Sequence, residues 1–325
     1  MGLAEEIKQK AFQLGFDLAG ITDASPLDND QFKSLTDWLA FGCAGRMDYM
    51  RDNLDKRTNP VKFLKSARSI ICLGLNYNPP PPDPSLRARH SRAKQSQPDD
   101  ALTGTVANYA RYEDYHLFIK QQLRKLTNFI ASIASTGFRF KICVDSAPLA
   151  ERTLAARAGL GFIGKNRMLI NPQLGPQIFL AEIVTSLKLP PDEPIKDACP
   201  GCNKCLTACP TGALTPDGHL DANKCISYLT IEYKDQFPPD LAKKIGARLF
   251  GCDECVLACP HHAAAPVCKN KQFKFYNDRA KLNLNEILKM SEDDFEARFP
   301  DSPFTRLGLD RLKRNAKTCL ANITG

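Results

Sequence analysis

The stretch from residue 199 to residue 210 reads CPGCNKCLTACP, and the stretch from residue 251 to residue 260 reads GCDECVLACP. The first has the spacing C-x2-C-x2-C-x3-C followed by proline, which is typical of bacterial-type ferredoxins. The second repeats the last three cysteines of that spacing and also ends in Cys-Pro. In proteins with two such runs, the last cysteine of each run binds the cluster of the other. The two stretches therefore predict two neighbouring [4Fe–4S] clusters and a protein that handles single electrons.

The crossed pattern divides eight cysteines into two groups. The ligands predicted for cluster 1 are Cys199, Cys202, Cys205 and Cys259. The ligands predicted for cluster 2 are Cys209, Cys225, Cys252 and Cys255. Cys225 stands alone between the two runs and is the natural candidate for the ligand that the second run lacks. Zinc also binds paired C-x2-C units, but nothing in zinc chemistry calls for C-x2-C-x2-C-x3-C-P, so iron–sulfur clusters are the stronger prediction.

The other cysteines and the overall composition describe an ordinary globular chain. Five further cysteines have no partner spacing and are expected to be buried thiols: Cys43, Cys72, Cys143, Cys268 and Cys319. The N-terminal residues form no apolar signal segment, and no apolar run is long enough for a membrane helix, so we expect a reducing cytoplasm. The net charge of +8 weakly favours a nucleic-acid or acidic partner, against the alternative of an enzyme with a mildly basic surface.

Hydrophobic periodicity predicts an α/β domain before the cysteines. The expected helices span 3–14, 30–50, 113–135 and 148–158, and the expected strands span 16–21, 69–75, 138–144, 168–170 and 178–187. The basic stretch 83–103 is expected to be an exposed loop. The predicted division is an α/β domain over 1–190, a ferredoxin-like domain with two clusters over 191–270, and a short helical C-terminal tail over 271–325.

Asp145 is the candidate acid of the first domain. It follows a predicted strand and precedes a predicted helix, which is where α/β domains place reactive groups. A carboxyl group there can act as a general acid if burial raises its pKa. The alternative is a structural aspartate that caps the helix or pairs with Arg152, and the segment alone favours that alternative. Lys165 follows three glycines that match neither phosphate-loop fingerprint, although it remains able to meet an anion.

Several unrelated motifs occur together in one order. They are the R-x2-P at Arg57, NYARYEDYH at 108–116, VDSAPLAERTLAARAGLGFIGKN at 144–166, CISYLTIE at 225–232 and the two cysteine runs. Over about residues 1–268 the chain resembles the epoxyqueuosine reductase family, QueG. It departs from the family's CPWN at Cys259-Pro-His261-His262, where solvated, exposed histidines are expected.

This resemblance implies properties that the residues alone do not reveal. It implies a cobalamin cofactor, contacted by Arg57 and by backbone around Tyr109 and Ser227. It implies reduction of epoxyqueuosine to queuosine in the anticodon loop of tRNA, the last step of queuosine biosynthesis, with Asp145 as the proton donor. In the family the cluster pattern is crossed, and the isolated cysteine matches Cys225. An external electron donor and a monomer are also implied.

Three rival functions remain at this point. The chain could be an iron–sulfur electron-transfer module, but a carrier needs neither a large α/β domain nor the Asp145 segment. It could be another corrinoid-dependent reductase, such as a reductive dehalogenase, although those enzymes typically carry a twin-arginine export signal that is missing here. It could also bind tRNA without changing it, with purely structural clusters.

Overall fold

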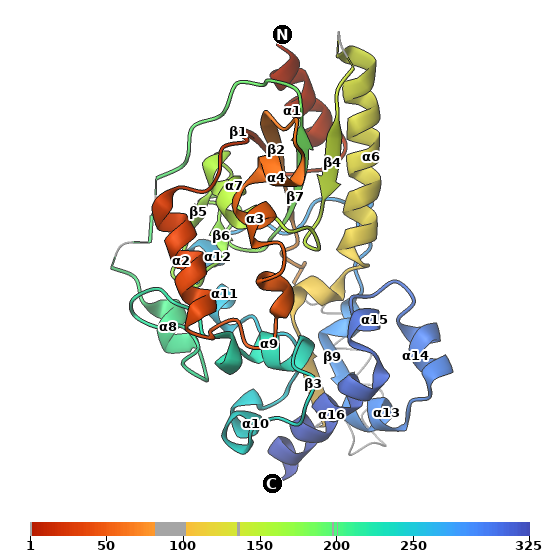
Figure 1. Cartoon of the computed structure of the whole chain (residues 1–325). Coiled ribbons are helices and arrows are strands. Elements are labelled where there is room, and N and C mark those ends of the chain that lie inside the picture. The colour runs from red at the N-terminus through yellow and green to blue at the C-terminus, as the bar shows by residue number, and fades with distance from the viewer. Residues whose placement is uncertain (1, 82–101, 135–136, 197, 200) are drawn as a thin grey trace.

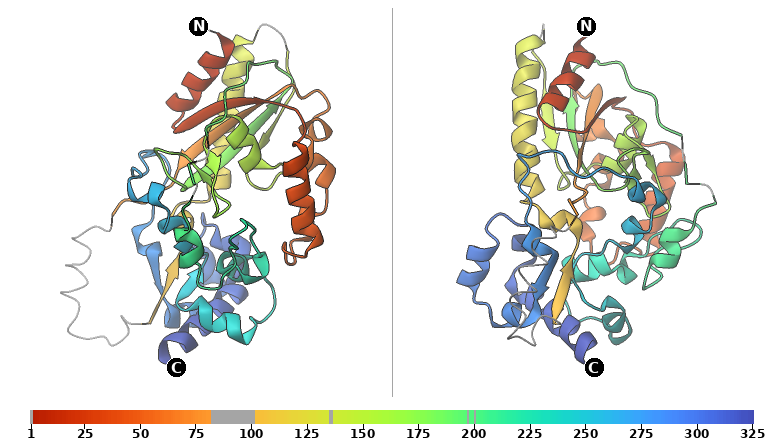
Figure 2. Two further views of the ribbon diagram at one scale, coloured as in Figure 1. Left: turned by 90° about the vertical axis from the view of Figure 1, so that its left-hand side faces the viewer. Right: turned by 180° about the vertical axis from the view of Figure 1, so that it is seen from behind.

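The computed structural model describes residues 2–81, 102–134, 137–196, 198–199 and 201–325. A four-stranded sheet lies at the N-terminal end of the molecule and a bundle of short helices at the C-terminal end (Figures 1 and 2). Most of the basic stretch that we expect to be a loop, residues 83–101, lies outside the described residues. Its end is not a loop, because Thr103 already begins a strand.

The apolar run at 69–75 forms the centre of the first sheet. Every residue of β2 (Ser69–Asn76) is buried, as the sequence predicts. The remaining strands are β1 (Leu18–Asp23), β7 (Ile178–Thr185) and β4 (Phe140–Cys143), and the order is β1-β2-β7-β4. All three pairings are antiparallel. The edge strand β4 leads directly into the segment that carries Asp145.

Helices cover both faces of this sheet, so alternate residues of each strand enter different cores. On one face, α1 (Leu3–Gln13) and α6 (Tyr115–Ile133) pack on Ile71, Leu73 and Ile183. On the other face, α7 (Glu151–Arg157) packs on a smaller cluster that includes Cys72, Cys143 and Val184. Cys72 and Cys143 are thus buried thiols, as expected.

A second sheet joins stretches that are far apart in the sequence. β3 (Thr103–Val106) lies between β8 (Arg248–Phe250), which is parallel to it, and β9 (Lys281–Asn283), which is antiparallel. The three strands come from the three segments predicted as separate domains, and they share one core with the C-terminal helices. The boundaries of those domains stay a prediction.

The helices of the cysteine region are all short. They are α8 (Lys204–Ala208), α9 (Ile226–Ile231), α10 (Pro239–Ile245), α11 (Glu254–Leu257) and α12 (Pro260–Ala263). Each cysteine run turns around one of these helices, and α8 lies against α11. Buried apolar side chains of this region, among them Ile226, Leu229, Leu249 and Phe250, belong to the core that it shares with the C-terminal helices.

The C-terminal residues form α13 (Leu284–Lys289), α14 (Glu292–Arg298), α15 (Phe304–Leu307) and α16 (Leu309–Thr324). The last of these helices supports α9. The guanidinium of Arg314 donates to the carbonyl oxygens of Leu229 at 3.1 Å and Tyr233 at 2.6 Å, and the Asn315 amide donates to Thr230 O at 2.8 Å. These donors satisfy carbonyl groups at the C-terminal end of α9 that have no partner within the helix.

Two helix predictions are wrong in their boundaries. The expected helix 30–50 is α2 (Asn29–Ala40) followed by a 3-10 turn, Asp48–Met50, because the chain bends at Gly42 and Gly45, whose φ angles are 71° and 59°. Two further helices follow, α3 (Leu54–Thr58) and α4 (Pro60–Phe63). Pro148 does not open a helix, since tight turns occupy 144–149 and α7 begins at Glu151.

The remaining elements are short. β5 (Phe162–Ile163) and β6 (Leu169–Ile170) form a small antiparallel pair. Single 3-10 turns span Asn108–Arg111, Ala222–Lys224 and Asn277–Ala280. Among the described residues, no helix combines the length and apolar character needed to cross a membrane.

Candidate functional site

Asp145 lies two residues after β4 in a turn with unusual backbone geometry. Its φ is 58°, in the left-handed region that side-chain-bearing residues rarely adopt. Its N–H donates to Oε1 of Glu151 at 2.7 Å, which ties the turn to the start of α7. The alternative that Asp145 caps α7 or pairs with Arg152 is wrong. The N-cap of α7 is Ala150, and the Arg152 guanidinium donates to Arg167 O at 2.9 Å.

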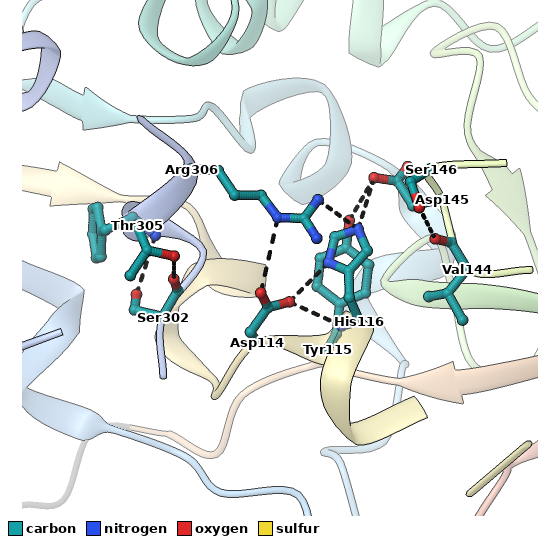
Figure 3. Close-up of polar contacts among 10 residues, drawn as sticks. Asp114, Tyr115, His116, Val144, Asp145, Ser146, Ser302, Thr305 and Arg306 are labelled. Atoms are coloured by element: carbon teal, nitrogen blue, oxygen red, sulfur yellow. Dashed lines mark hydrogen bonds and ion pairs between the residues drawn. The ribbon is translucent and has the colours of Figure 1, made fainter. Parts of the chain in front are cut away.

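The carboxyl group of Asp145 is held by the beginning of α6 (Figure 3). The Tyr115 hydroxyl donates to Asp145 Oδ2 at 2.9 Å, and His116 Nε2 lies 3.2 Å from the same oxygen. Asp114 caps α6 by accepting from His116 N at 2.9 Å, and it also contacts His116 Nδ1 at 2.8 Å. One helix start therefore orients both side chains that contact Asp145.

Arg306 brings the C-terminal region into this site. Its Nη1 lies 2.7 Å from His116 Nε2, and its Nε lies 3.8 Å from Asp114 Oδ2. A guanidinium only donates hydrogen bonds, so His116 Nε2 accepts from Arg306 when the ring is neutral. When the ring is protonated, Nε2 donates to Asp145 instead. The protonation state of His116 thus decides which of its two neighbours it binds.

The electrostatics keep Asp145 ionised in this arrangement. Burial acts to raise its pKa, but the contacts with His116, the Tyr115 hydroxyl and the nearby Arg306 outweigh burial and lower the pKa below its usual value. The pKa of His116 is raised, because its contacts with Asp114 and Asp145 outweigh the opposing effect of burial. The side chain of Asp145 is 58% exposed, so it is open to a ligand. A carboxylate here can take up a proton and pass it on.

Two of the residues predicted to contact a corrin, Arg57 and Tyr109, lie in the neighbourhood of Asp145. Burial and the neighbouring carboxylates Glu232 and Asp145 raise the pKa of Tyr49 to about 12, and Arg57 opposes that shift, so these groups lie close together. Arg57 donates through Nη1 to Leu149 O at 3.3 Å, while its buried Nε has no partner among the described residues.

Tyr109 and Ser227 are both half-buried. The negative charges of Asp145 and Glu232 help to raise the pKa of Tyr109, although burial is the larger cause. Ser227 lies in the first turn of α9, two residues after Cys225. An unpaired guanidinium N–H, a phenol and a helix start suit the polar amide groups around a corrin ring, so the residues present fit the cofactor.

The predicted ligands of cluster 1 converge on one small pocket. It is lined by Cys199, Cys202, Cys205 and Cys259 together with Lys165 and His261. The Lys165 ammonium, which donates to Asn203 Oδ1 at 2.8 Å, brings a positive charge to these thiols. The two histidines after Pro260 are half-buried, which corrects the expectation of exposed residues, and His261 packs edge-on against Phe162.

The predicted ligands of cluster 2 are also neighbours. Burial raises the pKa of the Cys255 thiol, and the nearby thiols of Cys252, Cys225 and Cys209 raise it further. Gly251 precedes this run with φ of 71°, and a Cβ there would lie 2.6 Å from Ala107 Cβ. Only glycine lets the backbone approach β3 so closely at this point. The pKa values of Cys225, Cys252 and Cys255 are raised mainly by burial, whereas hydrogen bonds to Thr211 and to nearby backbone N–H groups lower that of Cys209.

Comparison with known proteins identifies the family. A family model described as epoxyqueuosine reductase QueG, DUF1730, matches residues 57–146, and one described as a 4Fe-4S double cluster binding domain matches residues 198–262. The epoxyqueuosine reductase of Escherichia coli K12 is 34% identical over 98% of this chain and 81% of its own length. This chain belongs to the epoxyqueuosine reductase family. The double cluster domain also favours iron–sulfur clusters over zinc.

Further epoxyqueuosine reductases extend the match. The Leadbetterella byssophila protein is 38% identical over 96% of each chain. A crystal structure of epoxyqueuosine reductase with an epoxyqueuosine-modified tyrosine tRNA stem loop is 31% identical, with a TM-score of 0.87 over 99% of this chain and 81% of that one. A Bacillus subtilis epoxyqueuosine reductase, solved with a catalytic aspartate loop swung out of its active site, gives a TM-score of 0.86 at 30% identity over 99% of this chain and 82% of that one.

Sequence reasoning missed part of this epoxyqueuosine reductase site. Tyr115 and His116 belong to the quoted motif 108–116, but nothing in the motif indicates that they contact Asp145. Glu151 follows Asp145 closely enough in sequence to be considered and was not singled out. Arg306 has no local signal, because only the packing of α15 brings it to the start of α6.

Proposed function

We propose that this chain reduces epoxyqueuosine to queuosine in the anticodon loop of tRNA, which is the last step of queuosine biosynthesis. The observation that carries the proposal is Asp145, an accessible carboxylate that shares the neighbourhood of Tyr49 with Arg57 and with Glu232, which ends the α9 helix after Cys225. The family membership supplies the substrate class. The solved relative with its modified tRNA stem loop supports tRNA as the partner.

Electrons enter from an external donor and pass between the two clusters. We assign Cys199, Cys202, Cys205 and Cys259 to one cluster and Cys209, Cys225, Cys252 and Cys255 to the other. The proximity of each set of thiols supports this crossed assignment. Cys225 precedes α9, whose C-cap residue Glu232 lies near Tyr49 and Asp145, so cluster 2 is the cluster nearer the substrate in this proposal.

Cobalamin, when bound, supplies a strongly reducing cobalt centre for the epoxide. Arg57, Tyr109 and Ser227 are the residues that would hold it. Arg57 offers its unpaired Nε–H, and Ser227 offers the first turn of α9. Asp145 lies near Arg57 and Tyr109, so this proposal puts a proton-transfer group beside the bound cofactor.

Asp145 delivers a proton to the epoxide oxygen. Overall, two electrons and two protons convert the epoxide to an alkene and release the oxygen as water. Tyr115 and His116 orient the Asp145 carboxyl group, and His116 holds a proton at Nε2 when its ring is charged. Because the pKa of resting Asp145 is lowered, the carboxylate must gain its proton during the cycle. The Tyr115 hydroxyl is nearer but its pKa is raised, so we assign the proton transfer to His116, whose Nε2 lies 3.2 Å from Asp145 Oδ2.

The charge of the chain agrees with a tRNA substrate. A net charge of +8 favours binding of a polyanion, and an anticodon loop presents unpaired bases that can be splayed into a cleft. We propose that the enzyme works as a monomer in the cytoplasm.

The test is an anaerobic assay with reconstituted protein. Cobalamin, a strong reductant and tRNA that carries epoxyqueuosine are added. The tRNA is then digested, and the masses of its nucleosides are measured by mass spectrometry. We expect a product lighter by one oxygen atom. Full iron and bound corrin without conversion would favour another corrinoid-dependent reductase. Failure to bind corrin would favour an electron-transfer module.

A further inference from the structure

A pair of glutamates lies behind Asp145, between α7 and the first sheet. Glu182 is on β7 and has no solvent exposure. Its cross-strand neighbours are Cys72 on β2 and Cys143 on β4, both buried. Neither carboxylate oxygen of Glu182 has a conventional donor among the described residues. A buried carboxylate without donors is costly, so this side chain needs an explanation.

Glu151 supplies that explanation from the first turn of α7. Its Oε1 accepts the N–H of Asp145 at 2.7 Å, and its carboxyl group is within hydrogen-bonding reach of Glu182. Two carboxylates only accept hydrogen bonds, so the contact between them requires a proton on one of them. With Glu151 already accepting from Asp145, the arrangement places that proton on Glu182.

The surroundings agree with a shared proton. Burial, followed by the charge of Glu151, raises the pKa of Glu182 well above its usual value. Burial and the charge of Asp145 raise the pKa of Glu151 to about 8. The titratable groups close to the pair are Asp145, Arg57, Arg152, Cys72 and Cys143. Neither arginine makes a hydrogen bond to Glu182 in the described part of the chain.

We propose that Glu151 and Glu182 form a proton-sharing carboxyl pair that holds the Asp145 turn in its left-handed conformation. The inference rests on the proposed function of Asp145 for its catalytic meaning, but the pair itself is defined by geometry. Glu182 fixes Glu151, Glu151 fixes the Asp145 N–H, and the turn directs the carboxyl group toward Tyr115 and His116. Both glutamates are positioning residues.

The first test detects the shared proton without any turnover. Infrared spectra of the purified holoenzyme are recorded at pH 9, where Glu151 is ionised because its pKa is about 8, and are compared with those of Glu182→Gln and of Glu296→Gln, an exposed control on α14. We expect the carbonyl stretch of a protonated carboxylic acid in the wild type and in the control, and its loss in Glu182→Gln. The absence of this band from the wild type, or its persistence in Glu182→Gln, would overturn the proposal.

The second test measures the hydrogen-exchange rate of the Asp145 backbone amide. Glu151→Ala removes the hydrogen bond from the Asp145 N–H. The Asp145 amide hydrogen should therefore exchange about tenfold faster in this variant than in the wild type. Glu182→Gln keeps a donor for Glu151 and should preserve protection, whereas Glu182→Leu should lose it. Unchanged exchange in Glu151→Ala would refute the positioning role.

Kinetics then separate positioning from simple loss of structure. For Glu151→Ala we expect kcat to fall about tenfold with little change in KM for tRNA, because the turn but not the binding surface is altered. Iron content and corrin binding should match the wild type. Asp145→Asn tests the proposed function independently. Activity retained in that variant would remove the catalytic role of Asp145 and leave the infrared and exchange results on the pair intact.

Discussion

At the scale of single residues, Asp145 combines backbone strain with several restraining contacts. A left-handed backbone at a residue with a side chain costs about 1–3 kcal/mol. Three contacts oppose that cost: the N–H bond to Glu151, the hydroxyl of Tyr115 and the ring of His116. The turn is therefore held on two sides, by α7 and by α6, while the carboxyl group stays accessible. Strain retained in this way agrees with a functional position.

Asp145→Asn tests the proton donor. An amide fits the same space but cannot deliver a proton, so we expect turnover to fall at least a hundredfold, within the range for general acids. Iron content and corrin binding should be unchanged. The measurement is single-turnover conversion of epoxyqueuosine tRNA, with corrin binding followed by absorbance. Full activity would exclude Asp145 from the mechanism.

His116 gives a pH-dependent prediction. Its pKa is raised in the folded chain, so its contribution to stability is fully present below the unfolded value near 6.5 and is lost as pH rises through the folded value. The difference in melting temperature between the wild type and His116→Gln should therefore be largest near pH 6 and shrink above it. His219→Gln, at a side chain that is 48% exposed and outside the site, is the matched control for loss of a histidine ring. A constant difference across pH would contradict the charged-ring contact.

Cys225→Ala tests the unusual fourth ligand. If Cys225 binds cluster 2, its loss should remove about half of the bound iron and abolish turnover. Cys43→Ala is the matched control, because Cys43 belongs to neither predicted group. The measurement is iron per chain together with the electron paramagnetic resonance of the reduced protein. An iron content equal to that of the control would show that another residue completes the cluster.

At the scale of elements, α9 depends on α16. The short helix follows Cys225, carries Ser227 and ends in carbonyl groups that Arg314 and Asn315 satisfy. Six residues form too short a helix to be stable alone. The C-terminal helix is thus part of the scaffold of the cluster region.

Arg314→Ala should therefore weaken the cluster region from a distance. Removing a buried guanidinium leaves several carbonyl groups without donors, which costs about 2–4 kcal/mol. We expect a lower midpoint in chemical denaturation and faster loss of iron to a chelator. Lys317→Ala, at an exposed position on the same helix, should behave as the wild type. Equal chelation rates in both variants would count against the support of α9 by α16.

The sequence predicts elements better than it predicts their ends or partners. The apolar run of β2 and the periodic pattern of α6 are found as expected, since both follow from local burial. The expected helix 30–50 fails because left-handed glycines end it, and periodicity does not report φ. Arg306 could not be assigned, because its contact with His116 depends on the packing of α15. The cysteine groups could be proposed because their spacing is a local property.

At the scale of the whole molecule, the cores of the first sheet are joined to the core of the cysteine region and the C-terminal helices. The first sheet has its own apolar clusters on both faces, whereas the core of the cysteine region is shared with the C-terminal helices and packs against the predicted ligands Cys225 and Cys252. The sheet β8-β3-β9 connects them. The first sheet should consequently tolerate changes that destroy the clusters.

Removal of iron tests this division. In protein treated anaerobically with a chelator, we expect residues 199–260 to lose protection against hydrogen exchange, since metal binding stabilises such regions directly. β2, β7 and α6 should keep their protection. The matched reference is the reconstituted protein under the same conditions. Uniform loss of protection along the chain would show that the clusters stabilise the entire molecule.

The sheet formed by β3, β8 and β9 has a consequence for biosynthesis. β3 leaves the ribosome long before either of its neighbours, and at about 5–20 residues per second the delay to β9 is roughly ten to thirty seconds. The helix that supports α9 is made later still. Throughout this interval the nascent chain exposes an unpaired strand and, toward its end, thiols without metal. The cysteines are therefore synthesised before the helix that supports α9, and their thiols need protection from oxygen during that interval.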